Sequence, residues 1–157
     1  PAFDIQAVCT GFVYALDIAD KYIKTGAAKR VLVVGAETLS RIIDWTDRTT
    51  CVLFADGAGA VILEASEEQG ILSTHIHADG SFSDLLTTKA SITGVNTEAV
   101  HIGMKGNEVF KKAVNTLGAI VEETLEANNI EKNDIDWLVP HQANIRILGK
   151  LMDRLGV

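Results

Sequence analysis

The feature that most constrains the fold is a helical stripe followed at once by an unbroken apolar run. Apolar residues from Phe12 to Ile23 recur at helical spacing, and Gly26 follows them as a predicted helix end. The run Val31-Leu32-Val33-Val34 ends at Gly35 and is typical of a strand buried on both faces, as in a parallel sheet. A helix joined to a strand by a short connection is half of a βαβ unit, so the sequence predicts an α/β fold.

A similar order of elements returns in the second half of the chain. Helical spacing predicts a helix over 107–128 with Asn107 as its N-cap, and another that starts near Asn144 and ends at Gly156. The apolar face predicted for this last helix is Ile145, Leu148, Leu151, Met152 and Leu155. The other predicted strands are 3–8, 61–65, 71–78 and 134–139. The polar segments 37–50 and 79–96 are predicted as loops, and the charged segment 64–70 as a hinge.

Composition excludes several classes of protein. A formal net charge of −7 argues against nucleic acid as a partner of the chain as a whole. Two cysteines, Cys9 and Cys51, are too few for a disulfide scaffold and favour a reducing, cytoplasmic setting. No apolar run approaches the roughly 18 residues of a membrane span. The chain begins at Pro1 and ends at Val157, just after a predicted helix, so we expect a piece of a longer protein.

Two residues are candidates for chemistry. Cys9 is predicted at a sharp turn before a helix, where unpaired backbone N–H groups and the helix dipole favour the thiolate. The alternative is a small buried hydrophobe, as most free cysteines are. His141 follows Pro140 at a predicted strand end, where a histidine hydrogen-bonded at a helix start is the simpler interpretation. Together, a thiolate and an imidazole make a minimal acyl-transfer site, and ligands of α/β sheets bind where strands end.

Two other patterns have simpler interpretations than ligand binding. Gly57 and Gly59 lie in a segment that lacks the Lys-Ser/Thr ending of a P-loop and the spacing of a dinucleotide fingerprint. We interpret these glycines as positions of close backbone packing. His75 and His77 share one face of a predicted strand, but no cysteine or carboxylate completes a ligand set at suitable spacing. The sequence therefore predicts no metal site.

Two motifs then point to a family. The segments Ala2–Phe12, with Cys-Thr-Gly-Phe, and Trp137–Arg146, with Pro-His-Gln-Ala-Asn, closely resemble β-ketoacyl-[acyl-carrier-protein] synthase III. This family initiates bacterial type II fatty acid synthesis. The resemblance also covers Asp47-Arg48, Asp56–Ala60 and Gly106–Phe110. It implies a thiolase-like layered αβαβα fold, present here only in part. Residues 1–66 would be the C-terminal part of the first half, and residues 67–157 the N-terminal part of the second half.

The resemblance implies roles for the two candidate residues. Cys9 would accept the acetyl group of acetyl-CoA as a thioester. Malonyl-acyl carrier protein would then bind and lose CO₂, and the resulting carbanion would attack the acetyl-enzyme to give acetoacetyl-acyl carrier protein. His141 would stabilise the developing enolate oxygen during decarboxylation. The expected protein is an acyltransferase that needs no cofactor, since acetyl-CoA and the malonyl carrier are substrates.

Further residues match the family's binding segments. By this match, Arg48, Asn107, Phe110 and Asn144 would line the channel for CoA and phosphopantetheine. The acyl carrier protein would contact Gln142, Ala143, Asn144, Ile145, Arg146 and Lys111. Arg146, Lys111 and Lys112 would form a basic patch that suits an acidic carrier protein, although a solvated helix face explains the two lysines equally well. We expect a homodimer in the cytoplasm that binds neither nucleic acid nor a membrane.

Several alternatives stay open at this point. The family's third catalytic residue, an Asn in an Asn-Thr-Ser motif, would lie beyond the end of this chain, so we expect the chain alone to be inactive. A thiolase, a polyketide-type synthase or a hydroxymethylglutaryl-CoA synthase would also carry a nucleophilic cysteine after a strand. A non-catalytic fragment that acts only through association is a further possibility. A redox-sensing role for Cys9 is weakly supported, because no resolving cysteine lies nearby in the sequence.

Overall fold

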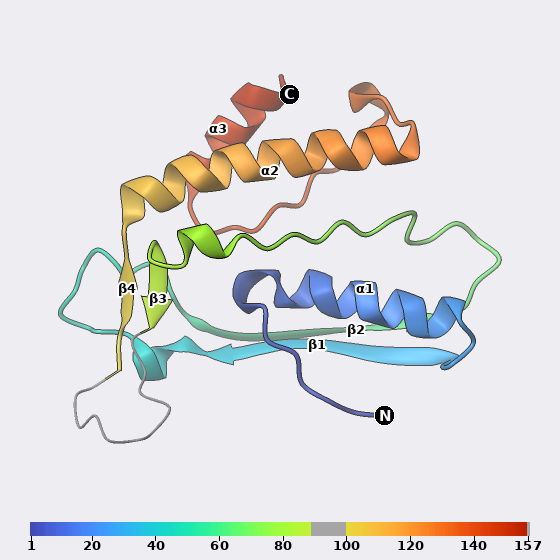
Figure 1. Cartoon of the computed structure of the whole chain (residues 1–157), viewed down its shortest axis with the longest axis horizontal. Coiled ribbons are helices and arrows are strands. Elements are labelled where there is room, and N and C mark those ends of the chain that lie inside the picture. The colour runs from blue at the N-terminus through green and yellow to red at the C-terminus, as the bar shows by residue number, and fades with distance from the viewer. Residues whose placement is uncertain (89–99, 157) are drawn as a thin grey trace. The chain divides into compact units, whose positions relative to one another are not determined.

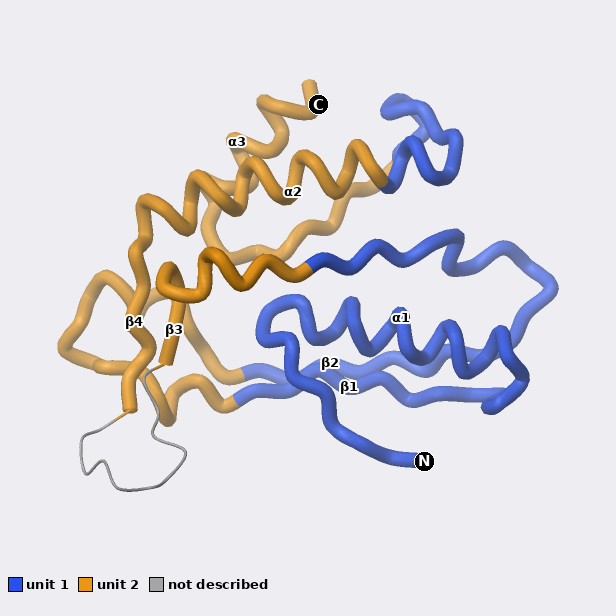
Figure 2. The backbone as a smooth tube through the Cα atoms, viewed as in Figure 1, with its two compact units in different colours: residues 1–37, 57–77, 124–135 blue, residues 38–56, 78–123, 136–157 orange. Residues whose placement is uncertain are grey.

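The computed structural model describes residues 1–88 and 100–156 of the chain. These residues fall into two compact units that interleave along the sequence (Figure 2). Unit 1 consists of Pro1–Glu37, Gly57–His77 and Thr124–Ile135. Unit 2 consists of Thr38–Asp56, Ala78–Glu123 and Asp136–Val157. No helix in the described part of the chain is both long enough and apolar enough to cross a lipid bilayer.

Unit 1 is built from a helix and a two-stranded sheet. Helix α1 spans Gly11–Lys24, strand β1 spans Arg30–Thr38 and strand β2 spans Asp56–Glu64 (Figure 1). The backbone N–H just after β2, at Ala65, donates to the carbonyl just before β1, at Lys29, so the two strands run antiparallel. The helix prediction is confirmed, and Gly26 after it has a left-handed φ of 74°.

The exposure of β1 differs from the sequence prediction. The central Val33 is buried, whereas its neighbours Leu32 and Val34 are 64% and 55% exposed. The partner strand in the described residues is antiparallel rather than parallel. The expectation of a parallel strand buried on both faces is therefore wrong for this chain, because only one face of the β1–β2 pair is covered here.

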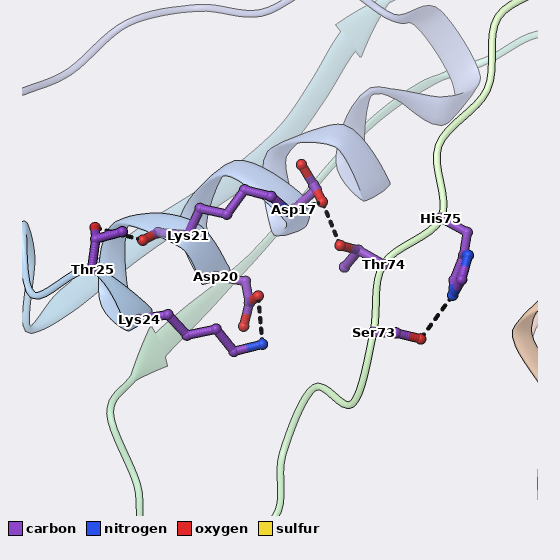
Figure 3. Close-up of polar contacts among 8 residues, drawn as sticks. All are labelled: Asp17, Asp20, Lys21, Lys24, Thr25, Ser73, Thr74 and His75. Atoms are coloured by element: carbon purple, nitrogen blue, oxygen red, sulfur yellow. Dashed lines mark hydrogen bonds and ion pairs between the residues drawn. The ribbon is translucent and has the colours of Figure 1, made fainter. Parts of the chain in front are cut away.

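A buried carboxylate ties α1 to the segment 71–77 (Figure 3). Asp17 is only 8% exposed and accepts hydrogen bonds from the Thr74 hydroxyl and the Lys21 ammonium group. The Tyr14 hydroxyl donates to the backbone carbonyl of His77 at 3.2 Å. These bonds hold a segment that the sequence predicts as a strand over 71–78. That prediction is wrong, because side chains rather than a ladder partner hold the segment.

Unit 2 contains a short hairpin that leads into the longest helix. Strand β3, Leu86–Thr88, pairs antiparallel with strand β4, Ile102–Met104, and Thr87 lies opposite Gly103. Helix α2, Gly106–Asn128, begins two residues after β4 and runs on into unit 1. The hairpin is missed by the sequence analysis, which predicts a loop over 79–96. Part of that predicted loop lies outside the described residues.

Helix α3, Ile145–Leu155, packs through a narrower face than predicted. Its buried residues are Ile147, Leu151 and Leu155, spaced four apart. The predicted face also contains Ile145 and Met152, but they are 79% and 40% exposed. On the same helix, the guanidinium of Arg154 lies over Gly118 of α2, in space that a β-carbon at that glycine would fill.

Two further strand predictions are wrong. Residues 1–7 and 135–144 contain no strand, although the sequence predicts strands over 3–8 and 134–139. The other regular elements among the described residues are 3₁₀ turns at Val8–Thr10, Leu39–Ile42, Gly80–Phe82 and Lys132–Asp134. Trp137 and Val139 in the second segment are 86% and 81% exposed. A strand needs a hydrogen-bonded neighbour, and none lies beside these segments in the described part of the chain.

Candidate active site

Cys9 lies on a tight turn directly before α1. The 3₁₀ turn Val8–Thr10 is closed by a hydrogen bond from the Thr10 N–H to the Ala7 carbonyl at 3.1 Å. The N–H of Gly11, the first residue of α1, donates to the Val8 carbonyl. The predicted turn and helix start are confirmed. Because the Cys9 side chain is exposed, the alternative of a small buried hydrophobe is wrong.

The electrostatic setting of Cys9 shifts the pKa of its thiol. The surrounding protein partly desolvates the thiol, and this desolvation raises the pKa of Cys9 above its ordinary value. A hydrogen bond from the backbone at Cys9 opposes the shift, and the Glu37 carboxylate adds to it by repelling a thiolate. Desolvation and the nearby negative charge together outweigh this backbone hydrogen bond. That the helix start favours the thiolate stays a prediction.

An open apolar groove runs between the start of α1 and the β1–β2 pair. Its lining residues are Phe12, Gly35, Glu37, Gly57, Ala58, Gly59, Ala60 and Val61. The small-residue segment 56–60 is part of β2 and not a phosphate-binding loop. A β-carbon at Gly57 would lie 3.0 Å from the Glu37 carboxylate, whereas one at Gly59 would meet nothing within 4 Å. Close packing therefore explains Gly57 but not Gly59.

His141 precedes α3 in an exposed segment without regular structure. Three residues later, Asn144 caps α3, since its side-chain oxygen accepts a hydrogen bond from the Arg146 N–H at 2.8 Å. The other end of the helix closes at Gly156, which has a left-handed φ of 74° and donates to the Met152 carbonyl. The predicted limits of this helix are confirmed. The cap fixes the direction in which the segment from His141 to Asn144 enters the helix.

Arg48 lies in a loop that aspartate side chains hold in shape. The carboxylate of Asp44 accepts bonds from Thr46, and that of Asp47 accepts bonds from Thr49 and Thr50. These bonds keep the pKa of both aspartates below the ordinary value. Arg48 itself is exposed. The loop therefore presents a cation on a rigid backbone.

The remaining predicted binding residues lie near the start of α2. Asn107 is the second residue of the helix, so the prediction that it is the N-cap is wrong. Phe110 is half-buried and Lys111 is exposed, with no ion pair to another described residue. Its neighbour Lys112 lies 3.6 Å from the Asp79 carboxylate, and its ammonium nitrogen is 3.7 Å from the centre of the Phe82 ring. The two lysines therefore differ in how freely they can meet a partner.

The two units divide the predicted site residues. Cys9 belongs to unit 1, while His141 and every predicted binding residue belong to unit 2. The predicted carrier-protein segment Gln142 to Arg146 is exposed except for the half-buried cap Asn144. Among the described residues, no group of three or more metal-ligating side chains comes together. Sequence reasoning misses Asp17, because it lies outside the apolar stripe predicted for α1 and is nevertheless buried.

Comparison with known proteins connects these features to one family. The sequence model for 3-oxoacyl-[acyl-carrier-protein] synthase III matches residues 3–80, and the model for the C-terminal part of the same proteins matches residues 125–157. The chain is 70% identical over 151 residues to the β-ketoacyl-[acyl-carrier-protein] synthase III of Thioalkalivibrio sulfidiphilus, covering 94% of this chain and 47% of that protein.

Solved structures agree with the sequence comparison. The 3-oxoacyl-[acyl-carrier-protein] synthase III of Aquifex aeolicus matches with a TM-score of 0.89 and 48% identity, covering 99% of this chain and 48% of that one. The priming β-ketosynthase of the R1128 polyketide pathway matches with a TM-score of 0.93 and 36% identity, covering 100% of this chain and 48% of that one. The predicted partial thiolase-like α/β fold is confirmed. The chain spans about half the length of the relatives it matches.

Proposed function

Because this chain belongs to the 3-oxoacyl-[acyl-carrier-protein] synthase III family, we propose that it is the central segment of such an enzyme and supplies its nucleophile and its histidine. The observation that carries the proposal is the exposed Cys9 on a hydrogen-bonded turn at the start of α1, inside a segment that matches the family. Residues 1–66 and 67–157 are assigned to the two halves of the full-length fold.

The first step is transfer of an acetyl group to Cys9. The thiolate attacks the thioester carbonyl of acetyl-CoA, a C–S bond forms to Cys9, and CoA leaves as its thiolate and takes up a proton. Because the pKa of Cys9 is raised in this chain, the thiol must lose its proton before it can attack. An imidazole such as that of His141 can pair with the thiolate once it forms.

The second step is a decarboxylative condensation. Malonyl-acyl carrier protein loses CO₂, and the electron pair of the broken C–C bond remains on the carrier-bound carbon as an enolate. A hydrogen bond from the His141 imidazole to the enolate oxygen stabilises this developing charge. The carbanion attacks the acetyl thioester, a C–C bond forms, and the Cys9 thiolate leaves. The product is acetoacetyl-acyl carrier protein, and the reaction needs no bound cofactor.

The remaining predicted residues are assigned to substrate binding. Arg48, Asn107, Phe110 and Asn144 would line the channel for CoA and phosphopantetheine. The exposed segment from Gln142 to Arg146, with Lys111, would contact the acyl carrier protein. Arg48, Lys111 and Arg146 are exposed and form no ion pair within the described residues. This supports the assignments, since such cations can meet phosphates and acidic helices. We further propose that the full-length protein is a homodimer in the cytoplasm.

Labelled acetyl-CoA tests the proposal directly. The full-length enzyme is incubated with it, and the acetyl-enzyme is measured for the wild type and for Cys9→Ala, with Cys51→Ala as the matched control. The wild type and Cys51→Ala should acquire label on the peptide that contains Cys9, and Cys9→Ala should acquire none. Label retained by Cys9→Ala would overturn the nucleophile assignment. The isolated 157 residues should show no detectable transfer, and robust turnover by them would contradict the proposal that they are only a segment.

A second function is favoured by one comparison. The match to a priming β-ketosynthase of a polyketide pathway points to the same chemistry with a different carrier protein. The two functions differ in the partner and not in the role of Cys9. Condensation rates measured with a fatty-acid and a polyketide acyl carrier protein separate them. A rate at least tenfold higher with the polyketide carrier would favour the second function.

A further inference from the structure

The residue before Cys9 has an unusual backbone conformation. Val8 has a φ of 48°, and among the described non-glycine residues only Asn129 shares a positive φ, at 54°. Asparagine adopts this region readily, but a β-branched residue there is a genuine outlier. The two residues also differ in position, because Asn129 follows the end of α2, where a left-handed residue is common, whereas Val8 lies within a turn.

The position of Val8 in the turn shows why its conformation bears on Cys9. The Thr10 N–H donates to the Ala7 carbonyl, so Val8 and Cys9 are the two central residues of the turn. The positive φ of Val8 therefore falls at the first central residue of the turn. A residue with a β-carbon pays a steric penalty in this region that glycine does not.

Packing does not explain the valine within the described residues. Its side chain is 80% exposed, so the strained residue is not retained here for burial. The conformation is instead followed immediately by the exposed thiol and then by α1. Strained backbone that persists without a packing reason is concentrated at functional sites, where it preorganises a reacting group.

We propose that Val8 is a positioning residue whose left-handed backbone, restricted by a β-carbon, holds the Cys9 sulfur in the orientation needed for attack. This inference rests on the proposed function, in which Cys9 is the nucleophile. Any L-residue at position 8 restricts the turn to a small range of backbone angles. Glycine relieves the steric penalty but lets the turn, and the thiol with it, sample other orientations.

Three variants of the full-length enzyme test this inference. Val8→Gly should lower kcat for acetyl transfer by about tenfold, with little change in KM, because misoriented thiols do not react. Val8→Ala keeps the β-carbon that restricts the backbone, so kcat should stay within about twofold of the wild-type value. Asn129→Gly makes the same kind of change at the other left-handed residue and should leave kcat unchanged.

A second readout does not depend on the substrate. The rate of Cys9 alkylation by iodoacetamide is followed against pH by peptide mass mapping. In Val8→Gly, the thiol should be more mobile and better solvated, so the pH midpoint of its alkylation should be lower. Reactivity toward the small reagent should then rise while turnover falls. Val8→Ala and Asn129→Gly should keep the wild-type midpoint.

The outcomes separate this inference from the proposed function. Equal losses of kcat in Val8→Gly and Val8→Ala would show that the side chain acts through packing and overturn the positioning role. Unchanged kcat and alkylation in Val8→Gly would overturn it as well. If Cys9→Ala retained acetyl label, the proposed function would fail. The alkylation profiles would then still decide whether Val8 orients the thiol.

Discussion

Two helix starts look alike in sequence but are built by different means. At the start of α1, Thr10 makes no side-chain cap, and the chain turns through the left-handed Val8 to present Cys9. At the start of α3, the backbone of Asn144 is extended and its side chain caps the helix, three residues after His141. Backbone conformation therefore places the thiol, and a side-chain hydrogen bond directs the segment that carries the imidazole.

The two helices are also anchored differently. Helix α1 is held by the buried carboxylate of Asp17, which accepts bonds from Thr74 and Lys21. Helix α3 is held by an apolar row and by Arg154, whose guanidinium donates to the Asn115 carbonyl at 3.1 Å. Each helix is therefore anchored by a charged side chain, Asp17 in the middle of α1 and Arg154 near the end of α3. The difference matters for how each helix responds to pH, because only the carboxylate titrates in the acid range.

The largest expected effect separates the roles of Cys9 and His141. In the full-length enzyme, His141→Ala should reduce condensation by about 100-fold or more, because a hydrogen bond to the developing enolate is lost. Acetyl transfer to Cys9 should persist in this variant, whereas Cys9→Ala should lose both steps. Separate assays of acetyl label and of acetoacetyl product measure the two steps. An equal loss of label in both variants would show that the imidazole is needed from the first step.

The next largest effect concerns the anchor of α1. Asp17→Asn should lower the free energy of unfolding by about 2 kcal/mol, because a charged hydrogen-bond acceptor is removed from a buried position. Asp20→Asn is the matched control, since Asp20 pairs with the exposed Lys24 at 2.8 Å and the change should cost about 0.5 kcal/mol or less. Denaturant titration of the full-length protein measures both. Similar losses in the two variants would contradict the anchoring role.

The same carboxylate gives a direction for the pH dependence. Hydrogen bonds from Lys21 and Thr74 hold the pKa of Asp17 below its ordinary value. The stability from this group is therefore fully present above the unfolded value of about 3.9, and it is lost as the pH falls through the lower folded value. The difference in unfolding free energy between wild type and Asp17→Asn should shrink as the pH falls below about 4. A difference that stayed constant down to pH 2 would contradict this assignment.

A smaller effect tests the cap of α3. Asn144→Ala should lower the free energy of unfolding by about 1 kcal/mol, while Asn144→Asp keeps a capping oxygen and should retain most of it. If the Asn144 amide also contacts the phosphopantetheine arm, as proposed, both variants should raise KM for malonyl-acyl carrier protein. Recovery of both stability and KM in Asn144→Asp would assign Asn144 to capping alone.

The smallest expected effect separates two neighbouring lysines in unit 2. Lys111→Ala should weaken binding of the acyl carrier protein by about threefold, since a free rim charge contributes modestly. Lys112→Ala should change it less, because Lys112 is already engaged by Asp79 and the Phe82 ring. The difference in affinity between the wild type and Lys111→Ala should be smaller at high salt than at low salt, because salt screens the lysine charge. A larger loss for Lys112→Ala would reverse the assignment.

Prediction from sequence succeeds where the determining interactions are local. The helices α1, α2 and α3 follow from apolar periodicity, and the ends of α3 follow from the capping residues Asn144 and Gly156. The strands over 3–8, 71–78 and 134–139 are not found, because a strand depends on a neighbour that local sequence does not specify. The hairpin of β3 and β4 is missed because each strand has only three residues, too few to give an alternating pattern.

The amino-acid sequence by itself determined the family, the helices and the candidate residues, because motif identity and helical periodicity are properties of neighbouring positions. Only the tertiary structure decided that Val8 is left-handed, that Asp17 is buried and bonded to Thr74, and that the pKa of the exposed Cys9 is raised by partial desolvation and by Glu37. Burial and pKa depend on contacts between residues distant in the chain, such as Asp17 with Thr74 and Cys9 with Glu37. They become visible only when the fold has brought those residues together.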